Sequence, residues 1–327
     1  MKELVDRILT GEYKLGSDAL MSQVVLLYKK GDPALFSNYR PIALLNSIYQ
    51  FVNIVITERT QQLTERHCVL QSGQYGFRWH RGVPMSAQRL QWTLKQARLK
   101  GGVLLQVNLD YRNAFNAAGH AQLWAILERL GVPDLDLIKA LYEHSDMSIL
   151  VGERSSGKVS MDRGTAQGST LSPLLFNLFL NALLRLLEAS GIGHGVAGVR
   201  DFNHLAFADD LSLLVASTAD AETLLGIIKR FEEWSGLSIS TQKSFLTGML
   251  FSPGSAISQR TVAAKTHRRK AELSSRRTCL DALAFESDDE TESLAYIRST
   301  APTSKACTEC GQGKGPHHFA SDDSASC

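Results

Sequence analysis

Short apolar runs alternate along the first 250 residues with longer segments in which apolar residues recur at helical spacing. The short runs are rich in β-branched and aliphatic residues and end at Gly, Pro or charged residues, as is typical of strands. They predict strands over residues 22–28, 103–109, 203–208, 211–215 and 245–249, and two short strands flanking residues 152–157. The longer segments predict helices over residues 46–65, 84–100, 121–130, 135–143, 172–188 and 219–234. In the fifth of these helices, Ser172 is expected to be the N-cap and Pro173 the first helical residue.

The pattern changes after Pro253. Residues 260–277 are basic, residues 288–292 are acidic, and Ser and Thr are frequent throughout. Such a composition cannot bury enough apolar surface to fold, so it predicts a disordered C-terminal tail. We expect a low-complexity charged linker over residues 251–306, followed by a small cysteine cluster over residues 307–327.

Composition narrows the class of protein. With 327 residues, 44% of them apolar, the chain is long enough for two domains, or for one large domain and a tail. A net charge of +2 is too mild to indicate nucleic-acid binding by itself. No run of 18 uncharged apolar residues predicts a membrane span, and the first residues do not resemble a signal peptide. Five cysteines, three of them within the last 21 residues, argue against a disulfide framework and for an intracellular protein.

Three aspartates carry the candidate chemistry. Asp209 and Asp210 lie between two predicted strands, and Asp110 follows the end of another. Nucleotide polymerisation uses two divalent cations held about 3.5–4 Å apart, and Mg²⁺ prefers carboxylate oxygens. Taken alone, the Asp-Asp pair also fits a solvated turn.

Eight segments occur in an order that is typical of one family. They are 28–33 (YKKGDP), 37–46 (SNYRPIALLN), 74–78 (QYGFR), 109–116 (LDYRNAFN), 163–168 (RGTAQG), 171–177 (LSPLLFN), 207–210 (FADD) and 234–237 (WSGL, followed by Lys243 and Ser244). Over residues 20 to 250 the chain therefore resembles the reverse transcriptase domain of non-LTR (LINE-type) retrotransposons. It looks closest to the elements of protist and algal genomes.

The resemblance implies an α+β fold, the fingers and palm of a right-hand polymerase. Residues 1–100 would be the fingers, and residues 101–250 the palm, whose antiparallel sheet packs on helices. A recognisable thumb is lacking, as are the endonuclease and nucleic-acid-binding domains of full elements. Because Met1 falls inside the expected fingers, the resemblance also suggests a fragment or a decayed copy.

The resemblance also assigns roles to the aspartates. Asp110 and Asp209 would bind two Mg²⁺ ions directly, Asp210 would be more peripheral, and Mn²⁺ could substitute for Mg²⁺. The alternative is that all three are solvated turn residues.

Further roles follow for residues that match the family pattern. Phe115 would lie under the sugar of the incoming nucleotide and select deoxynucleotides, or else be a core residue. Arg40 would contact the triphosphate, whose oxygens suit a guanidinium. Gln167 and Gly168 would line the nucleotide pocket. Lys243 would act near the pyrophosphate, or else be a surface lysine.

Two further groups of residues can each be interpreted in two ways. In loop 77–81, the arginines could grip phosphates while the aromatic rings stack on bases, or the loop could be a buried anchor. Cys307 and Cys310 have the Cys-x2-Cys spacing of half a zinc site, either a working Zn²⁺ site or a truncated one.

The predicted function is that of an RNA-directed DNA polymerase. It would use an RNA template, a DNA primer or target, and deoxynucleoside triphosphates, with no membrane partner, in the nucleus and the cytoplasm. A catalytically silent relic that only binds RNA or DNA is the alternative. An RNA-directed RNA polymerase is disfavoured by Phe115, because a ribonucleotide enzyme needs room for the 2′-hydroxyl.

Overall fold

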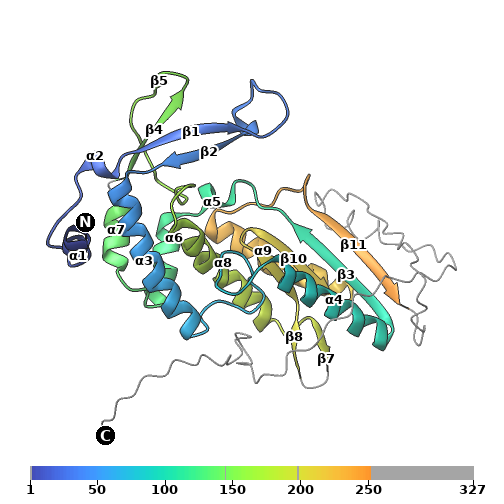
Figure 1. Cartoon of the computed structure of the whole chain (residues 1–327). Helices are drawn as coiled ribbons and strands as arrows, with labels where there is room; N and C mark the ends of the chain where they lie inside the picture. Colours follow the sequence, from blue (N-terminus) through green and yellow to red (C-terminus); the bar gives the residue numbers. More distant parts are fainter. Residues whose placement is uncertain (1, 144, 197–198, 252–327) are drawn as a thin grey trace, which may run out of the picture.

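The computed structural model describes residues 2–143, 145–196 and 199–251 (Figure 1). Its helices are α1 (Lys2–Leu9), α2 (Ser17–Leu20), η1 (Phe36–Asn38, a 3₁₀ turn), α3 (Ser47–Arg66), α4 (Val83–Lys100), α5 (Ala114–Ala117), α6 (His120–Arg129), α7 (Leu135–Glu143), α8 (Ser172–Ala189) and α9 (Thr218–Ser235). Its strands are β1 (Ser22–Tyr28), β2 (Tyr39–Leu44), β3 (Gly102–Leu109), β4 (Asp146–Val151), β5 (Arg154–Ser155), β6 (Val159–Ser160), β7 (His194–Val196), β8 (Val199–Phe202), β9 (His204–Phe207), β10 (Asp210–Val215) and β11 (Phe245–Phe251).

A four-stranded antiparallel sheet, in the order β11-β3-β10-β9, forms one half of the fold. The register places Leu211 of β10 opposite Leu109, the last residue of β3. Since side chains alternate across a strand, Leu105, Val107 and Leu109 all point to one face of this sheet. Asp110, which follows Leu109, and Asp210, the first residue of β10, therefore lie at the same end of the sheet.

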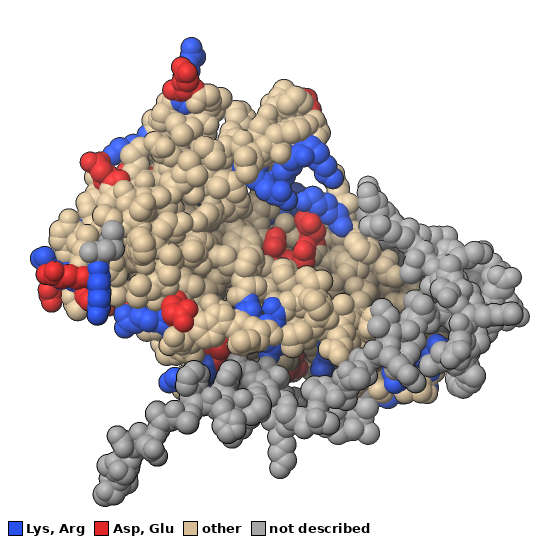
Figure 2. All heavy atoms as spheres, viewed as in Figure 1, with Lys and Arg blue, Asp and Glu red and all other residues tan. Residues whose placement is uncertain are grey.

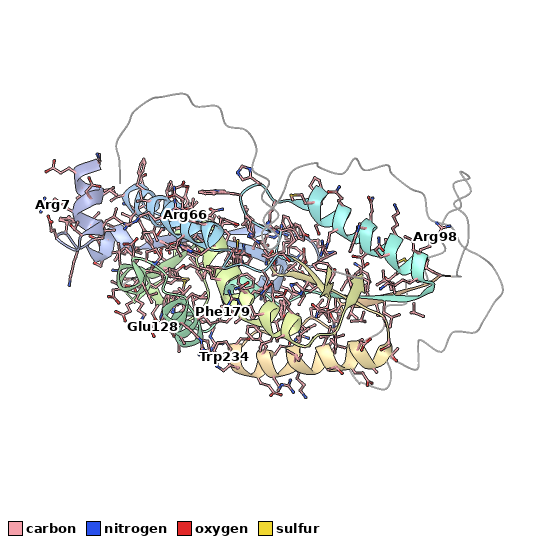
Figure 3. All side chains as sticks on the ribbon, turned by 90° about the horizontal axis from the view of Figure 1, so that it is seen from below. Arg7, Arg66, Arg98, Glu128, Phe179 and Trp234 are labelled. Atoms are coloured by element: carbon pink, nitrogen blue, oxygen red, sulfur yellow. The ribbon has the colours of Figure 1, made fainter. Side chains whose placement is uncertain are left out.

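Helices cover both faces of this sheet. On one face, α8 and α9 pack in the main hydrophobic core, where Phe179 and Trp234 stack with their ring centroids 6.3 Å apart. On the other face, Ala97 of α4 packs against Leu104 and Leu214. Figure 3 shows the helices that carry Arg98 (α4) and Trp234 (α9) on opposite sides of the sheet. The sheet is thus the middle layer of three.

Helix α8 is apolar on nearly all sides because it lies in this core. The predicted core residues Leu174, Leu175, Leu178 and Phe179 are all buried, which confirms that reading. By length and composition alone α8 could cross a membrane, but 67% of it is buried inside the fold. Its apolar character is thereby explained by packing within the protein.

A second sheet lies above the first in Figure 1, in the order β2-β1-β4-β5, with β6 also paired to β4. Strand β1 pairs antiparallel with β2 and parallel with β4, so residues of the predicted fingers and palm share one sheet. A backbone hydrogen bond of 2.6 Å from the amide of Ala43 to the carbonyl of Gln167 joins β2 to the segment before α8. The division at residue 100 stays a prediction.

Most predicted elements are confirmed to within two residues, and the strand at 22–28 and the helix at 135–143 coincide with β1 and α7. Strand β2 was not predicted, because Pro41 interrupts its pattern; an edge strand tolerates this residue. The predicted cap of α8 is wrong by one residue. Leu171 is the N-cap, and the hydroxyl of Ser172 instead donates to the carbonyl of Ala166 at 2.8 Å.

The observed mixture of helices and sheets is consistent with the α+β class. The expectation that a thumb is lacking stays a prediction, as does the disorder of the tail, because residues 252–327 lie outside the described residues.

Candidate active site

A tight hairpin carries two of the three aspartates. Phe207 ends β9 and pairs with Asp210, the first residue of β10, so that only Ala208 and Asp209 form the connection. Ala208 is buried and has a φ of +55°, in the left-handed region that non-glycine residues seldom adopt. The hairpin is therefore sharp, and it presents both carboxylates at the end of the sheet.

Asp110 reaches the same end of the sheet from β3. Its backbone amide donates to the hydroxyl of Ser244 at 3.2 Å, and its carbonyl accepts from the amide of Ser240 at 2.7 Å. The segment before β11 thus fixes the backbone of Asp110. Ser244 belongs to a segment that matches the family pattern, whereas Ser240 could not be singled out from the sequence, because serine is common in any loop.

The three aspartates line one cavity of about 660 Å³. The structure brings every other predicted site residue among the described ones into the same cavity: Arg40, Phe115, Gln167, Gly168 and Lys243. Lys29 and Phe77 line it as well. Cys307 and Cys310 lie outside the described residues.

Burial and mutual repulsion act on the carboxylates. Burial raises the pKa of Asp209, and the neighbouring charges of Asp210 and Asp110 raise it further, against a backbone hydrogen bond and Lys243. Burial also raises the pKa of Asp210, with Asp110 adding to the effect. The folded chain therefore disfavours the ionised form of these two carboxyl groups.

Basic side chains surround the carboxylates. Nζ of Lys243 lies 3.2 Å from Oδ1 of Asp110. Partial burial lowers the pKa of the Lys29 ammonium, and the positive charges of Arg40 and Lys243 lower it further. On the face shown in Figure 2, a group of acidic side chains lies directly beside a group of basic ones, between the two sheets. The cavity thus offers sites for both cations and anions.

Phe115 lies between the cavity and the hydrophobic core. The residue lines the cavity, and its ring stacks on Phe176 of α8 with a centroid distance of 4.6 Å. The amide of Thr165 donates to its carbonyl at 2.6 Å, which fixes the short helix α5. A ring held by the core in this way has one defined position in the cavity.

The backbone of β2 leaves no room for a side chain at Gly168. Its φ is +125°, and an added Cβ would lie 2.3 Å from the carbonyl oxygen of Ala43. Its own carbonyl accepts from Nε2 of Gln50 at 2.7 Å. The close approach is thus to the backbone of β2, where the second sheet meets the segment before α8.

In loop 77–81, one residue is a buried anchor and another is exposed in the cavity. Arg78 is buried and forms a bidentate ion pair with Glu65, at 2.6 and 2.7 Å. Arg81 donates to the carbonyl of Ser72 at 2.8 Å. Arg78 is therefore an anchor, and the prediction that it grips phosphates is wrong. Phe77, in contrast, is 54% exposed and open to a ligand.

The donor set fits a divalent cation. Among the residues that the structure describes, no three Asp, Glu, His or Cys side chains are gathered closely around one point. Three carboxylates nevertheless line one cavity, and the raised pKa of two of them reflects a need for a compensating positive charge. Carboxylate oxygens are the ligands that Mg²⁺ and Mn²⁺ prefer.

Comparison with known proteins agrees with this geometry. The sequence profile described as "Reverse transcriptase (RNA-dependent DNA polymerase)" matches residues 28–273, most of the chain. The chain belongs to the reverse transcriptase family. Family membership and relatives described as RNA-directed DNA polymerases support an enzyme.

The relatives of this reverse transcriptase domain are non-LTR retrotransposon proteins. A Pol polyprotein of the type-1 element R2 from Popillia japonica is 30% identical over 72% of this chain and 33% of its own length. An RNA-directed DNA polymerase of the mobile element jockey from Drosophila funebris is 28% identical over 65% of this chain and 23% of its own length. The chain thus spans a third or less of these relatives. The expected nearness to protist and algal elements stays a prediction.

The fold is also that of solved telomerases. In a Candida tropicalis telomerase bound to a fragment of telomeric RNA, the matching region covers 80% of this chain and 46% of the telomerase, with a TM-score of 0.55 and 12% identity. This similarity shows the reverse transcriptase fold.

Proposed function

We propose that this chain extends the 3′-OH of a primer with deoxynucleoside triphosphates on an RNA template, by two-metal nucleotidyl transfer. The observation that carries the proposal is one cavity that contains three carboxylates, three basic side chains and a core-supported aromatic ring. Metal-assisted phosphoryl chemistry uses carboxylates to hold the ions and basic side chains to bind phosphate.

Asp110 and Asp209 would hold the two Mg²⁺ ions, with Asp210 at the edge of the site. When bound, the ions supply positive charge that favours loss of the primer hydroxyl proton and stabilises the leaving pyrophosphate. The protein holds the carboxylates in place by the hydrogen bonds of Asp110 to the Ser240–Ser244 segment and by the hairpin at Asp209.

The basic residues would bind the triphosphate. Arg40 can form bidentate hydrogen bonds to phosphate oxygens, while Lys29 and Lys243 act as point charges. Lys243 pairs with Asp110. With substrate bound, a cation would take the place of the ammonium beside Asp110, and the triphosphate would take the place of the carboxylate beside Lys243. The Lys243 ammonium would then be free to protonate the departing pyrophosphate.

The sugar and base would lie along the opposite wall of the cavity. Phe115 would exclude a 2′-hydroxyl, because its ring is fixed by Phe176 and cannot move away freely. Gln167 and Gly168 would form the adjacent wall. The proposal is supported by the presence of Phe115, Gln167 and Gly168 in the lining of one cavity.

The partners follow from the reaction. RNA template, DNA primer and deoxynucleotides would meet at the cavity, with Mn²⁺ able to replace Mg²⁺. The same proposal assigns the fingers to residues 1–100 and the palm to residues 101–250. It also has the protein act in the nucleus, after template capture in the cytoplasm. So does a zinc site at Cys307 and Cys310.

Primer extension on an RNA template with a DNA primer tests the proposal. Wild type, an Asp209→Ala/Asp210→Ala double variant and the surface control Asp6→Ala are compared in Mg²⁺ and in Mn²⁺. We expect extension by wild type and by the control, and none by the double variant. Duplex binding by a folded wild type that extends nothing would instead support the silent relic.

A further inference from the structure

The hairpin that carries Asp209 is held by a side chain from a distant part of the chain. Gln74 is fully buried, and its Oε1 accepts hydrogen bonds from the backbone amides of Ala208 and Gly76, at 2.9 and 3.0 Å. Its Nε2 donates to the carbonyl of Ala208 at 3.3 Å. One side-chain amide therefore binds both backbone polar groups of the residue that precedes Asp209.

Ala208 needs such a partner. It is buried, and it lies in the connection between β9 and β10, where the hydrogen bonds of the strand ladder end. Its left-handed φ of +55° is strained for a residue with a Cβ atom. A buried backbone amide or carbonyl without a partner is strongly unfavourable. Gln74 satisfies both groups in the strained conformation and so favours that conformation over its relaxed alternatives.

Gln74 is itself fixed on both sides. The amide of Tyr75 donates to the carbonyl of Ala206 at 2.8 Å, and the amide of Ala206 donates to the carbonyl of Gly73 at 2.7 Å, so the loop lies along β9 like an added strand. Nη1 of Arg78 donates to the carbonyl of Gln74 at 3.2 Å, and the Glu65 carboxylate of α3 holds that guanidinium.

A second contact leaves little room for the loop to move. Nδ2 of Asn177 in α8 donates to the carbonyl of Gly76 at 2.7 Å. A Cβ added at Gly76 would lie 2.4 Å from the backbone nitrogen of Ala208. The loop backbone thus presses directly on the hairpin, and the amide of Gln74 occupies a single position against it.

We infer that Gln74 is a positioning residue that sets the Asp209 hairpin in its metal-binding conformation. This inference rests on the proposed function, since Asp209 has to be a metal ligand. Groups that orient metal ligands typically contribute on the order of 10- to 100-fold to metal affinity or activity. A merely structural role, in which Gln74 only stabilises the fold, would change stability without changing metal binding by the folded protein.

The test compares Gln74→Met, which has similar length but no hydrogen-bonding amide, with wild type. Gln62→Met is the matched control, because Gln62 is exposed on α3 and its side-chain amide donates to the neighbouring Glu58 carboxylate. Four quantities are measured on folded protein: Mn²⁺ binding by the EPR signal of the free ion, kcat and KM for deoxynucleotide in primer extension, and the thermal midpoint.

We expect Gln74→Met to bind Mn²⁺ on the order of tenfold more weakly and to lose kcat by a similar factor. KM for the nucleotide should stay within about threefold, because Gln74 does not line the cavity. The control should match wild type. If Gln74→Met does not fold, Gln74→Leu takes its place, because its apolar side chain likewise offers neither a donor nor an acceptor to Ala208.

Wild-type Mn²⁺ binding and kcat in a folded Gln74 variant would overturn the inference and leave the proposed function intact. A wild type that neither binds Mn²⁺ nor extends a primer would overturn the proposed function, and the inference with it. The two failures are distinguished by wild type alone.

Discussion

Nζ of Lys243 lies 3.2 Å from Oδ1 of Asp110, although 133 positions separate the two residues in the chain. The pairing of β11 with β3 produces this contact, because Phe245 lies opposite Asn108 and the segments just outside the two strands meet. A lysine therefore offsets part of the negative charge of the carboxylate cluster. Lys29 and Arg40 line the same cavity, and the charges of Arg40, Lys243 and Asp110 all act on the Lys29 ammonium.

Replacing this lysine should separate catalysis from metal binding. We expect Lys243→Gln to reduce kcat by about 100-fold if the ammonium protonates the leaving pyrophosphate. The Mg²⁺ concentration for half-maximal rate should fall, because the ion no longer competes with the ammonium for Asp110. Mg²⁺ titrations of primer extension measure both, with exposed Lys158→Gln as the control. An unchanged kcat would make Lys243 a surface lysine.

The carboxylate cluster should reduce stability when metal is absent. Since burial and like charges raise the pKa of Asp209 above its usual range, its ionised form opposes folding near neutral pH. Asp209→Asn should therefore raise the thermal midpoint in EDTA by about 1–2 °C, after allowance for solvent screening, while abolishing extension. The gain should shrink as the pH falls toward the raised pKa, where wild type is protonated as well.

Added Mg²⁺ completes that test. It should raise the thermal midpoint of wild type and leave that of Asp209→Asn nearly unchanged, because binding to the folded state alone is stabilising. Differential scanning fluorimetry in EDTA and in Mg²⁺ gives both values. A destabilised Asp209→Asn in EDTA would show that the carboxylates do not repel one another as described.

Phe77 should contribute to nucleic-acid binding. Its ring is 54% exposed, lines the cavity, and is held by a backbone with a φ of +52° between Gly76 and the buried Arg78. Stacking of one base on an aromatic ring is worth about 1–3 kcal/mol, so Phe77→Ala should weaken binding by about tenfold. Fluorescence anisotropy with a recessed RNA–DNA duplex measures this. The control is Phe36→Ala, whose ring is 78% exposed on the β1–β2 hairpin. Equal affinities for both variants would argue against stacking.

Arg78 should affect stability instead. Arg78→Ala leaves the carboxylate of Glu65 buried without its partner, which typically reduces the free energy of unfolding by about 3–5 kcal/mol. The double variant Glu65→Leu/Arg78→Met should recover part of this loss, because it removes both charges. Urea unfolding measures the difference. Exposed Arg66→Ala, at the end of α3 in Figure 3, should change stability by less than about 0.5 kcal/mol.

Sequence alone predicted most of the elements, because their patterns are local. Strands β3 and β10 read clearly as apolar runs, and Asp110 and Asp210 lie at their ends. The family resemblance placed the three aspartates together, and the antiparallel register supplies the physical reason. The same reasoning could not find the parallel pairing of β1 with β4, since no local signal links segments so far apart.

The supporting residues were also out of reach. Gln74 is one glutamine in a glycine-rich loop, and its role becomes visible only when that loop lies along β9. Arg78 resembles a phosphate-binding residue until Glu65 is seen beside it. In both cases the partner comes from a different element, so the meaning of the residue depends on tertiary structure.

Phe115 should set the choice of sugar. The ring stacks on Phe176 and lines the same cavity as Asp110, so a nucleotide whose reacting phosphate lies at the aspartates would bring its sugar near this ring. Phe115→Val removes the ring but keeps a branched apolar side chain, at a loss of about 1–2 kcal/mol in stability. We expect it to raise incorporation of ribonucleotides relative to deoxynucleotides by about tenfold or more. Single-nucleotide incorporation by both proteins measures the ratio, with exposed Phe51→Val as the control. A parallel fall with both nucleotides would mean that the ring serves the core alone, and a wild type that prefers ribonucleotides would indicate an RNA polymerase.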